Sequence, residues 1–131
     1  MTAQRPIDDY MSALTVTIGS DQPMSDAATR MREHGFRHVP VLYGGKLVGI
    51  LSDRDLAMVE SLGGVDPDEV PVREAMTPEP YTVSRGTPVG EVVAEMAEHK
   101  YGTAVITDAG KPVGIFTTID ALRLCAELLG R

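Results

Sequence analysis

The chain has 131 residues, of which 43% are hydrophobic, so it can bury the core of one compact domain or of two intimate halves. Its formal net charge of -7 disfavours binding to nucleic acid or to an anionic membrane, because both attract clustered Lys and Arg. No apolar run approaches the roughly 20 residues that cross a bilayer, no signal-peptide pattern is present, and Cys125 has no second cysteine to pair with. These features predict a cytoplasmic protein with no membrane partner.

The sequence contains one unit twice, at an offset of 65 residues and without a gap. The offset places Met11 on Met76 and Asp55 on Asp120. It also aligns Thr17 with Thr82, Pro23 with Pro88, Met31 with Met96, and Gly49 with Gly114. Such a repeat indicates one supersecondary unit per copy and a core that the copies complete together. We therefore divide the chain into a first copy at 1–62, a connector at 63–72 and a second copy at 73–131.

The first copy predicts five elements in chain order. Residues 16–18 are typical of a short strand, and apolar residues at helical spacing between Met24 and Met31 predict a helix with Pro23 in its first turn. Two apolar runs at 39–42 and 47–51, separated by a glycine turn, predict a hairpin. A second helix is expected over 53–62.

The second copy repeats this order. It predicts a strand at 81–83, a helix after Pro88 with Thr87 as its N-cap, a hairpin from 104–107 and 113–116, and a helix over 118–129. Each copy thus reads strand, helix, strand, strand, helix. The fold class that follows is α+β.

The two hairpins end in the same motif. The segments Gly49 to Asp55 and Gly114 to Asp120 share a Gly, two apolar residues, a hydroxyl residue, two variable residues and an Asp. This spacing places a hydroxyl where a strand becomes a helix and where free backbone N–H groups suit a phosphate. The Asp lies one turn further on, where a carboxylate can accept hydrogen bonds from both hydroxyls of a ribose.

A purely structural interpretation of the motif stays open. Ser52 and Thr117 are good N-cap residues, and an Asp in a first helical turn favours the helix dipole without any ligand. A single occurrence would support both interpretations about equally. The recurrence at the same offset in both copies favours the ligand interpretation.

On these residues the two copies resemble a tandem pair of CBS domains, also called a Bateman module. The resemblance covers about residues 7–128, and the first copy also matches the second-strand motif of the family at Arg37-His38-Val39-Pro40-Val41. The second copy departs from that motif at Gly102-Thr103-Ala104-Val105-Ile106. The resemblance implies two repeats related by a pseudo-twofold axis, with sheets packed together, helices outside, and clefts between the repeats.

In many family members these clefts bind an adenine nucleotide (AMP, ADP or ATP) or a related adenosyl compound. The resemblance implies that Asp55 and Asp120 hold ribose hydroxyls and that Ser52 and Thr117 approach the phosphate. Positive charge near the phosphate would come from Arg37, His38 and Arg54, and the positions that match these in the second copy include Thr103 and Ile119. The adenine would lie against Thr15, Val16 and Pro40, and against Pro80, Tyr81 and Val105.

The two clefts are not expected to be equivalent. Arg54, Arg37 and His38 surround the first motif, whereas Ile119 and Gly102-Thr103 surround the second. A charged phosphate is therefore expected near Asp55. The second cleft would prefer a nucleoside, a monophosphate or no ligand.

The leading hypothesis is a non-enzymatic regulatory module that binds an adenine nucleotide and signals to an unknown target protein by a change in conformation or partner affinity. No catalytic residue and no metal site is predicted, since neither a nucleophile with a base nor a ligand cluster has recognisable spacing. The apolar stretch 121–129 favours a homodimer. The alternative is a ligand-free structural or interaction module with the same fold.

Overall fold

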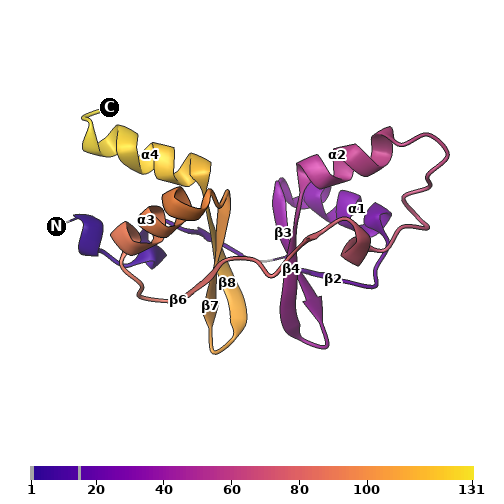
Figure 1. Cartoon of the computed structure of the whole chain (residues 1–131), viewed down its shortest axis with the longest axis horizontal. Coiled ribbons are helices and arrows are strands. Elements are labelled where there is room, and N and C mark those ends of the chain that lie inside the picture. Colours follow the sequence, from indigo (N-terminus) through magenta and orange to yellow (C-terminus); the bar gives the residue numbers. More distant parts are fainter. Residues whose placement is uncertain (1, 15) are drawn as a thin grey trace. The chain divides into compact units, whose positions relative to one another are not determined.

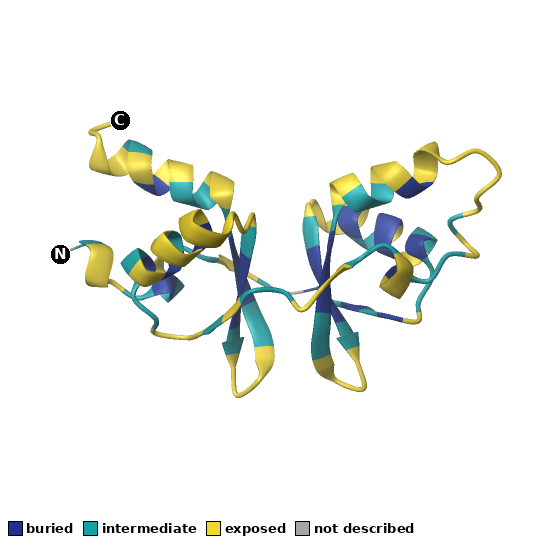
Figure 2. Ribbon diagram, viewed as in Figure 1, coloured by how far each residue is buried: buried dark blue, intermediate teal, exposed yellow. Residues whose placement is uncertain are grey.

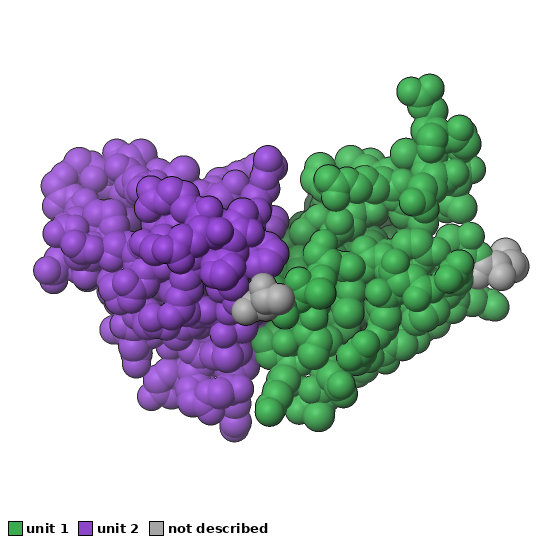
Figure 3. Space-filling model, turned by 180° about the vertical axis from the view of Figure 1, so that it is seen from behind, with its two compact units in different colours: residues 1–14, 81–131 green, residues 15–80 purple. Residues whose placement is uncertain are grey.

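A computed structural model describes residues 2–14 and 16–131. The chain forms two compact units, which Figure 3 distinguishes by colour. Unit 1 combines residues 1–14 with residues 81–131, and unit 2 comprises residues 15–80. We call residues 2–14 leader 1 and residues 66–80 leader 2. In the described part of the chain, no helix is long and apolar enough to cross a membrane.

Unit 2 contains a four-stranded sheet in the order β2-β3-β4-β5. Strands β2 and β3 are parallel, and the other two pairings are antiparallel. The elements are β2 (Ile18–Gly19), α1 (Met24–His34), β3 (His38–Tyr43), β4 (Lys46–Ser52), α2 (Asp53–Ser61), η3 (Val72–Glu74) and β5 (Thr77–Pro78). Figure 1 labels the main elements.

Unit 1 repeats this design with a sheet in the order β1-β8-β7-β6. Its elements are η1 (Thr2–Gln4), η2 (Ile7–Asp9), β1 (Ser12–Ala13), β6 (Thr82–Ser84), α3 (Val89–His99), β7 (Thr103–Asp108), β8 (Lys111–Thr117) and α4 (Thr118–Leu128). The order strand, helix, strand, strand, helix is thus present in each repeat, which confirms the predicted α+β class.

Both hairpins turn through two residues with positive φ. Gly44 and Gly45 have φ of 57° and 81°, and Ala109 and Gly110 have φ of 52° and 82°. Two-residue turns of this handedness match the right-handed twist of the strands they connect. The predicted hairpins are therefore present, and each strand is longer than predicted by two or three residues.

Each unit has its own apolar core between its helices and its sheet. In unit 2 the core includes Ile18, Val39 and Leu51, and in unit 1 it includes Ile106 and Phe116, all almost completely buried. Figure 2 shows the buried residues along the strands and on the inner faces of the helices. Burying one such side chain contributes about 1.5–3 kcal/mol.

The leaders are exchanged between the repeats. Leader 2 adds β5 to the edge of β4, with Thr77 paired to Ile50, and leader 1 adds β1 to the edge of β8, with Ser12 paired to Ile115. Each compact unit therefore contains the leader that precedes the other repeat. The sequence repeats and the compact units consequently divide the chain at different residues.

Equivalent hydrogen bonds hold the two leaders. The N–H of Ile7 donates to the carbonyl of Thr87 at 2.8 Å, and the N–H of Val72 donates to the carbonyl of Gln22 at the same distance. Met11 lies against Gly114 and Met76 lies against Gly49. A Cβ at Gly49 would be 2.9 Å from the carbonyl oxygen of Thr77, so this glycine admits the leader to the sheet.

Two local predictions were wrong. Pro88, not Thr87, precedes the first residue of α3, and the hydroxyl of Thr87 instead donates to the carbonyl of Ser84 at 2.7 Å. The first strand of each repeat lies slightly later than predicted, at 18–19 and 82–84. Both shifts follow from the docked leaders, which pair with the backbone just before each first helix.

Candidate ligand-binding corners

In unit 2 the repeated motif forms a turn from strand to helix, which we call the unit 2 corner (Arg37, His38, Ser52, Arg54, Asp55). Strand β4 ends at Ser52, which caps α2. The N–H of Asp55 donates to the Ser52 hydroxyl at 3.1 Å, and the N–H of Ser52 donates to Asp55 Oδ2 at 2.9 Å. This reciprocal pair is a capping box, so the motif stabilises the helix whether or not a ligand is bound.

Unit 1 has the same arrangement at the unit 1 corner (Gly102, Thr103, Thr117, Ile119, Asp120). The N–H of Thr117 donates to Asp120 Oδ2 at 2.8 Å, and the N–H of Asp120 donates to the Thr117 hydroxyl at 3.3 Å. The hydroxyl of Thr117 also donates to Asp120 Oδ2 at 3.1 Å. Among the described residues, the Ser52 hydroxyl makes no equivalent donation to Asp55.

The capping boxes use only one oxygen of each carboxylate. Asp55 and Asp120 both accept through Oδ2, and both side chains are only partly buried. A carboxylate offers about four lone-pair directions, so Oδ1 can still accept further hydrogen bonds. The structural interpretation of the motif is therefore present in the fold, and it leaves room for a ribose.

Three basic residues belong to the unit 2 corner. His38 pairs with Ser52 across the hairpin, and the N–H of Asp53 donates to the carbonyl of Arg37 at 2.8 Å. These contacts place residues 37 and 38 beside the first turn of α2, where Arg54 also lies. Arg37 and Arg54 are exposed, and within the described residues neither forms an ion pair.

The unit 1 corner has a different charge pattern. Thr103 pairs with Thr117, the N–H of Thr118 donates to the carbonyl of Gly102 at 3.1 Å, and Ile119 is exposed. Arg123 Nη1 lies 3.7 Å from Asp120 Oδ1, the oxygen that the cap leaves available. The sequence analysis missed Arg123, although its position three residues after Asp120 on one helix predicts this contact.

The residues expected to contact adenine are divided between the units. Tyr81 and Val105 lie together in unit 1, because the N–H of Val105 donates to the carbonyl of Tyr81 at 2.9 Å. Val16 and Pro40 are buried in unit 2, which also contains Pro80. The predicted contact residue Thr15 lies outside the described residues.

The side chain of Tyr81 belongs to an aromatic stack rather than to an open surface. Its ring stacks on Tyr101 at 5.0 Å between centroids, and Tyr101 stacks on His99 at 5.1 Å. Partial burial raises the pKa of the Tyr81 phenol, and the nearby carboxylates of Glu95 and Glu91 raise it further. The Tyr81 ring is therefore already engaged in packing within unit 1.

A hollow of about 350 Å³ adjoins the unit 1 corner and is lined in part by Tyr101, Gly102 and Thr118. A second hollow of about 390 Å³ lies in unit 2 beside Arg73 and Asp21. Neither hollow is lined by Asp55 or Asp120. Among residues 2–14 and 16–131, no group of three His, Cys, Asp or Glu side chains is arranged to hold a metal ion.

Comparisons with known proteins agree with this architecture. The chain is 30% identical over 109 residues to the CBS domain-containing protein YhcV of Bacillus subtilis, covering 83% of this chain and 77% of the relative. It is 31% identical over 119 residues to an inosine-5'-monophosphate dehydrogenase of Korarchaeum cryptofilum, covering 90% of this chain but only 24% of that enzyme. Relatives of this chain thus include CBS regions of larger enzymes.

Among solved structures, the CBS domain pair of protein MJ0100, in complex with 5'-methylthioadenosine and S-adenosyl-L-methionine, aligns with a TM-score of 0.79 at 26% identity. The alignment covers 94% of this chain and 97% of that one. The CBS domain profile matches residues 7–61 and 72–127. The chain belongs to the CBS domain family and carries two CBS domains in tandem.

Proposed function

We propose that the protein is a non-catalytic, cytoplasmic regulatory module that binds an adenine nucleotide or adenosyl ligand at its strand-to-helix corners. The observation that carries the proposal is the unit 2 corner, where an available carboxylate oxygen lies at a helix N-terminus beside Arg37 and Arg54, two exposed residues that form no ion pair within the described part of the chain. The adenosyl ligands of the MJ0100 domain pair support the same ligand class.

Each group at the unit 2 corner has a distinct role in this proposal. Asp55 Oδ1 accepts hydrogen bonds from the ribose hydroxyls. The amides of Asp53 and Asp55 are already bonded, whereas that of Arg54 has no recorded acceptor in the described chain and can donate to a phosphate. Arg37 and Arg54 add charge-assisted hydrogen bonds to the same phosphate.

The unit 1 corner suits a ligand with less charge. Arg123 already approaches Asp120 Oδ1, and Ile119 replaces the Arg54 of the other corner. We expect this corner to bind a nucleoside, a monophosphate or no ligand. In either case, a ligand that binds one conformation more tightly shifts the population toward it, and this shift is the signal passed to a target protein.

Calorimetry on ligand-free protein tests the proposal with adenosine, AMP, ADP, ATP, NAD and S-adenosylmethionine. Arg54→Ile, which copies the residue of the second repeat, should weaken binding of AMP or ATP by roughly tenfold and leave adenosine almost unchanged. Ile119→Arg is the matched control, because it adds a charge at the equivalent position. Absence of saturable binding by every one of these compounds would overturn the proposal.

The capping boxes favour a second candidate, a ligand-free structural or interaction module. The boxes give both Asp residues a structural role without any ligand. Asp55→Asn distinguishes the two candidates, since the amide oxygen can still accept from the Ser52 N–H while the amide nitrogen can no longer accept from a ribose. Loss of binding at unchanged stability supports the regulatory module, and an unchanged titration supports the structural one.

A further inference from the structure

The two leader-docking sites carry ion pairs of opposite polarity. In unit 1, Asp8 on leader 1 pairs with Arg85 in the turn after β6, with its Oδ2 2.8 Å from the Arg85 Nε. In unit 2, Arg73 on leader 2 pairs with Asp21 in the turn after β2 at 2.6 Å. Residues 8 and 73 are equivalent in the repeat. The leader thus carries the acid in unit 1 and the base in unit 2, and the partners Arg85 and Asp21 stand at neighbouring positions of the repeat, since Asp21 matches Gly86.

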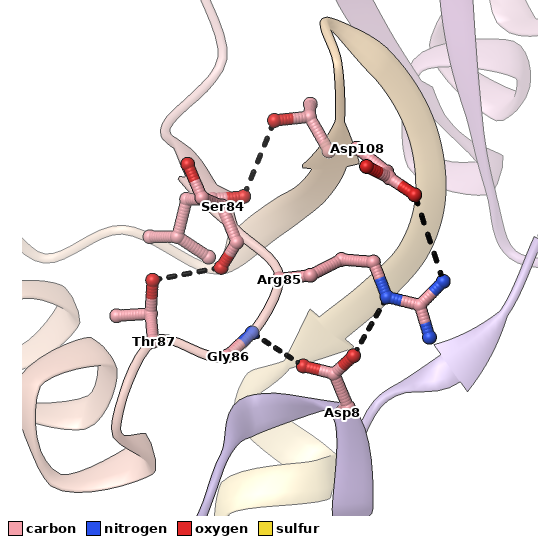
Figure 4. Close-up of polar contacts among 8 residues, drawn as sticks. Asp8, Ser84, Arg85, Gly86, Thr87 and Asp108 are labelled. Carbon is pink, nitrogen blue, oxygen red and sulfur yellow. Dashed lines mark hydrogen bonds and ion pairs between the residues drawn. The ribbon is translucent and has the colours of Figure 1, made fainter.

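The contact in unit 1 is more elaborate than a single surface ion pair. Figure 4 shows Asp8 held on both sides, since its Oδ1 also accepts the N–H of Gly86 at 2.7 Å. Arg85 Nη1 lies 3.9 Å from Asp108 as well. These hydrogen bonds and the Arg85 charge lower the pKa of Asp8, so the carboxylate stays ionised at neutral pH.

The apolar contacts of the leaders are similar at the two sites. Ile7 and Val72 are equivalent and both completely buried, and Met11 and Met76 lie against equivalent glycines. Leaders 1 and 2 thus present a similar apolar pattern, in which Tyr10 of leader 1 stands at the position of Ala75 in leader 2. A tandem repeat built in this way is exposed to docking of each leader on the wrong partner.

We propose that the sign of this charge selects the leader that each unit accepts: the docking surface of unit 1 takes a leader with an acid at this position, and that of unit 2 takes one with a base. Leader 1 on the unit 2 surface would place Asp8 against Asp21. Leader 2 on the unit 1 surface would place Arg73 against Arg85, a clash that Asp108 offsets only in part. Both mismatches bring like charges together, and both correct pairings bring opposite charges together.

Hydrogen exchange on the full-length chain tests the proposal at the leader amides. In Asp8→Arg, the Ile7 and Leu14 amides, which donate to Thr87 and Val113, should lose roughly tenfold in protection. Asp9→Arg is the matched control, because Asp9 pairs with Arg5 inside the leader and not with the unit. The control should retain protection within roughly twofold.

Rescue decides whether charge or local folding is responsible. Adding Arg85→Asp to Asp8→Arg should restore most of the protection, because the pair is inverted to the polarity found in unit 2. Arg73→Asp and its rescue by Asp21→Arg should behave in the same way at the Val72 and Arg73 amides. Equal losses in Asp8→Arg and Asp9→Arg, or no rescue in either pair, would overturn the proposal.

Discussion

The two units share a hydrogen-bond plan and differ in where their charges lie. Both contain a capping box, a glycine under a leader methionine, and a leader strand at the sheet edge. At the corners, however, Arg54 is replaced by Ile119, and Met58 is replaced by Arg123. What the duplication retains is therefore the fold, and what it has varied is the electrostatics that a ligand would meet.

Substitution of the glycines under the leaders should give the largest losses of stability, and the loss should differ between Gly49 and Gly114. A Cβ at Gly49 would have a backbone oxygen among its three nearest atoms, whereas at Gly114 all three would belong to the side chain of Met11, whose Cγ would be 2.9 Å away. A methionine can move, but a paired strand cannot. We expect Gly49→Ala to lower the free energy of unfolding by about 3 kcal/mol and Gly114→Ala by about 1 kcal/mol.

Urea unfolding measures both losses. Gly63→Ala is the control, because its Cβ would meet nothing within 4 Å and its φ is not positive. Equal losses at Gly49 and Gly114 would show that the two leaders dock with the same rigidity.

Removal of the capping boxes tests what the units share. Asp55→Ala and Asp120→Ala delete the acceptors of the partly buried N–H groups of Ser52 and Thr117. Each substitution should cost about 1–2 kcal/mol of stability in thermal unfolding. The two losses should agree within about 1 kcal/mol, because each box contains the same reciprocal pair of hydrogen bonds and the exposed Arg123 adds little at Asp120. A cost at only one corner would contradict a common structural role for the motif.

Exchanging the residues at positions 58 and 123 tests what the units do not share. Arg123→Met should free Asp120 Oδ1 and tighten adenosine binding at the unit 1 corner a few-fold, while stability changes by less than about 0.5 kcal/mol. Met58→Arg should bring a guanidinium to Asp55 and weaken adenosine binding at the unit 2 corner a few-fold. Calorimetric titration measures the adenosine affinity of both variants, and the two changes in affinity must have opposite signs.

Lowering the pH should produce the smallest of these effects, at the docking site of leader 1. The folded pKa of Asp8 is lowered, so its ionisation contributes stability above its unfolded pKa, and this contribution is lost as the pH falls through the folded value. The difference in melting temperature between the wild type and Asp8→Asn should therefore be present at pH 6 and vanish as the pH falls below about 3.8. A difference that persists in acid would assign the effect to side-chain shape.

Local features were predictable because the residues that determine each of them lie close together in the sequence. The hairpins follow from Gly44-Gly45 and its counterpart, and the helices α1 and α3 follow from apolar spacing. The hydroxyl-to-Asp motif was found by its recurrence, and its alternative role as a cap was visible from the residue types alone.

The leader exchange was not predictable in the same way. Ser12 pairs with Ile115, more than 100 residues away, and a two-residue strand has no periodicity to detect. The shift of the first strands and the wrong cap at Thr87 follow from that omission. Arg123 is a different kind of miss, since a spacing of three on a helix was available in the sequence.

The exchange of leaders has a consequence for a chain that is cut. Cleavage in the exposed Leu62–Gly64 stretch would yield two fragments, and neither would correspond to a compact unit, because each unit contains segments from both sides of the cut. The fragments would stay interlocked through two separate strand pairings, β1 with β8 and β4 with β5. A nick would then show on a denaturing gel while the native particle kept its size, so the connector can be lost without the two halves parting.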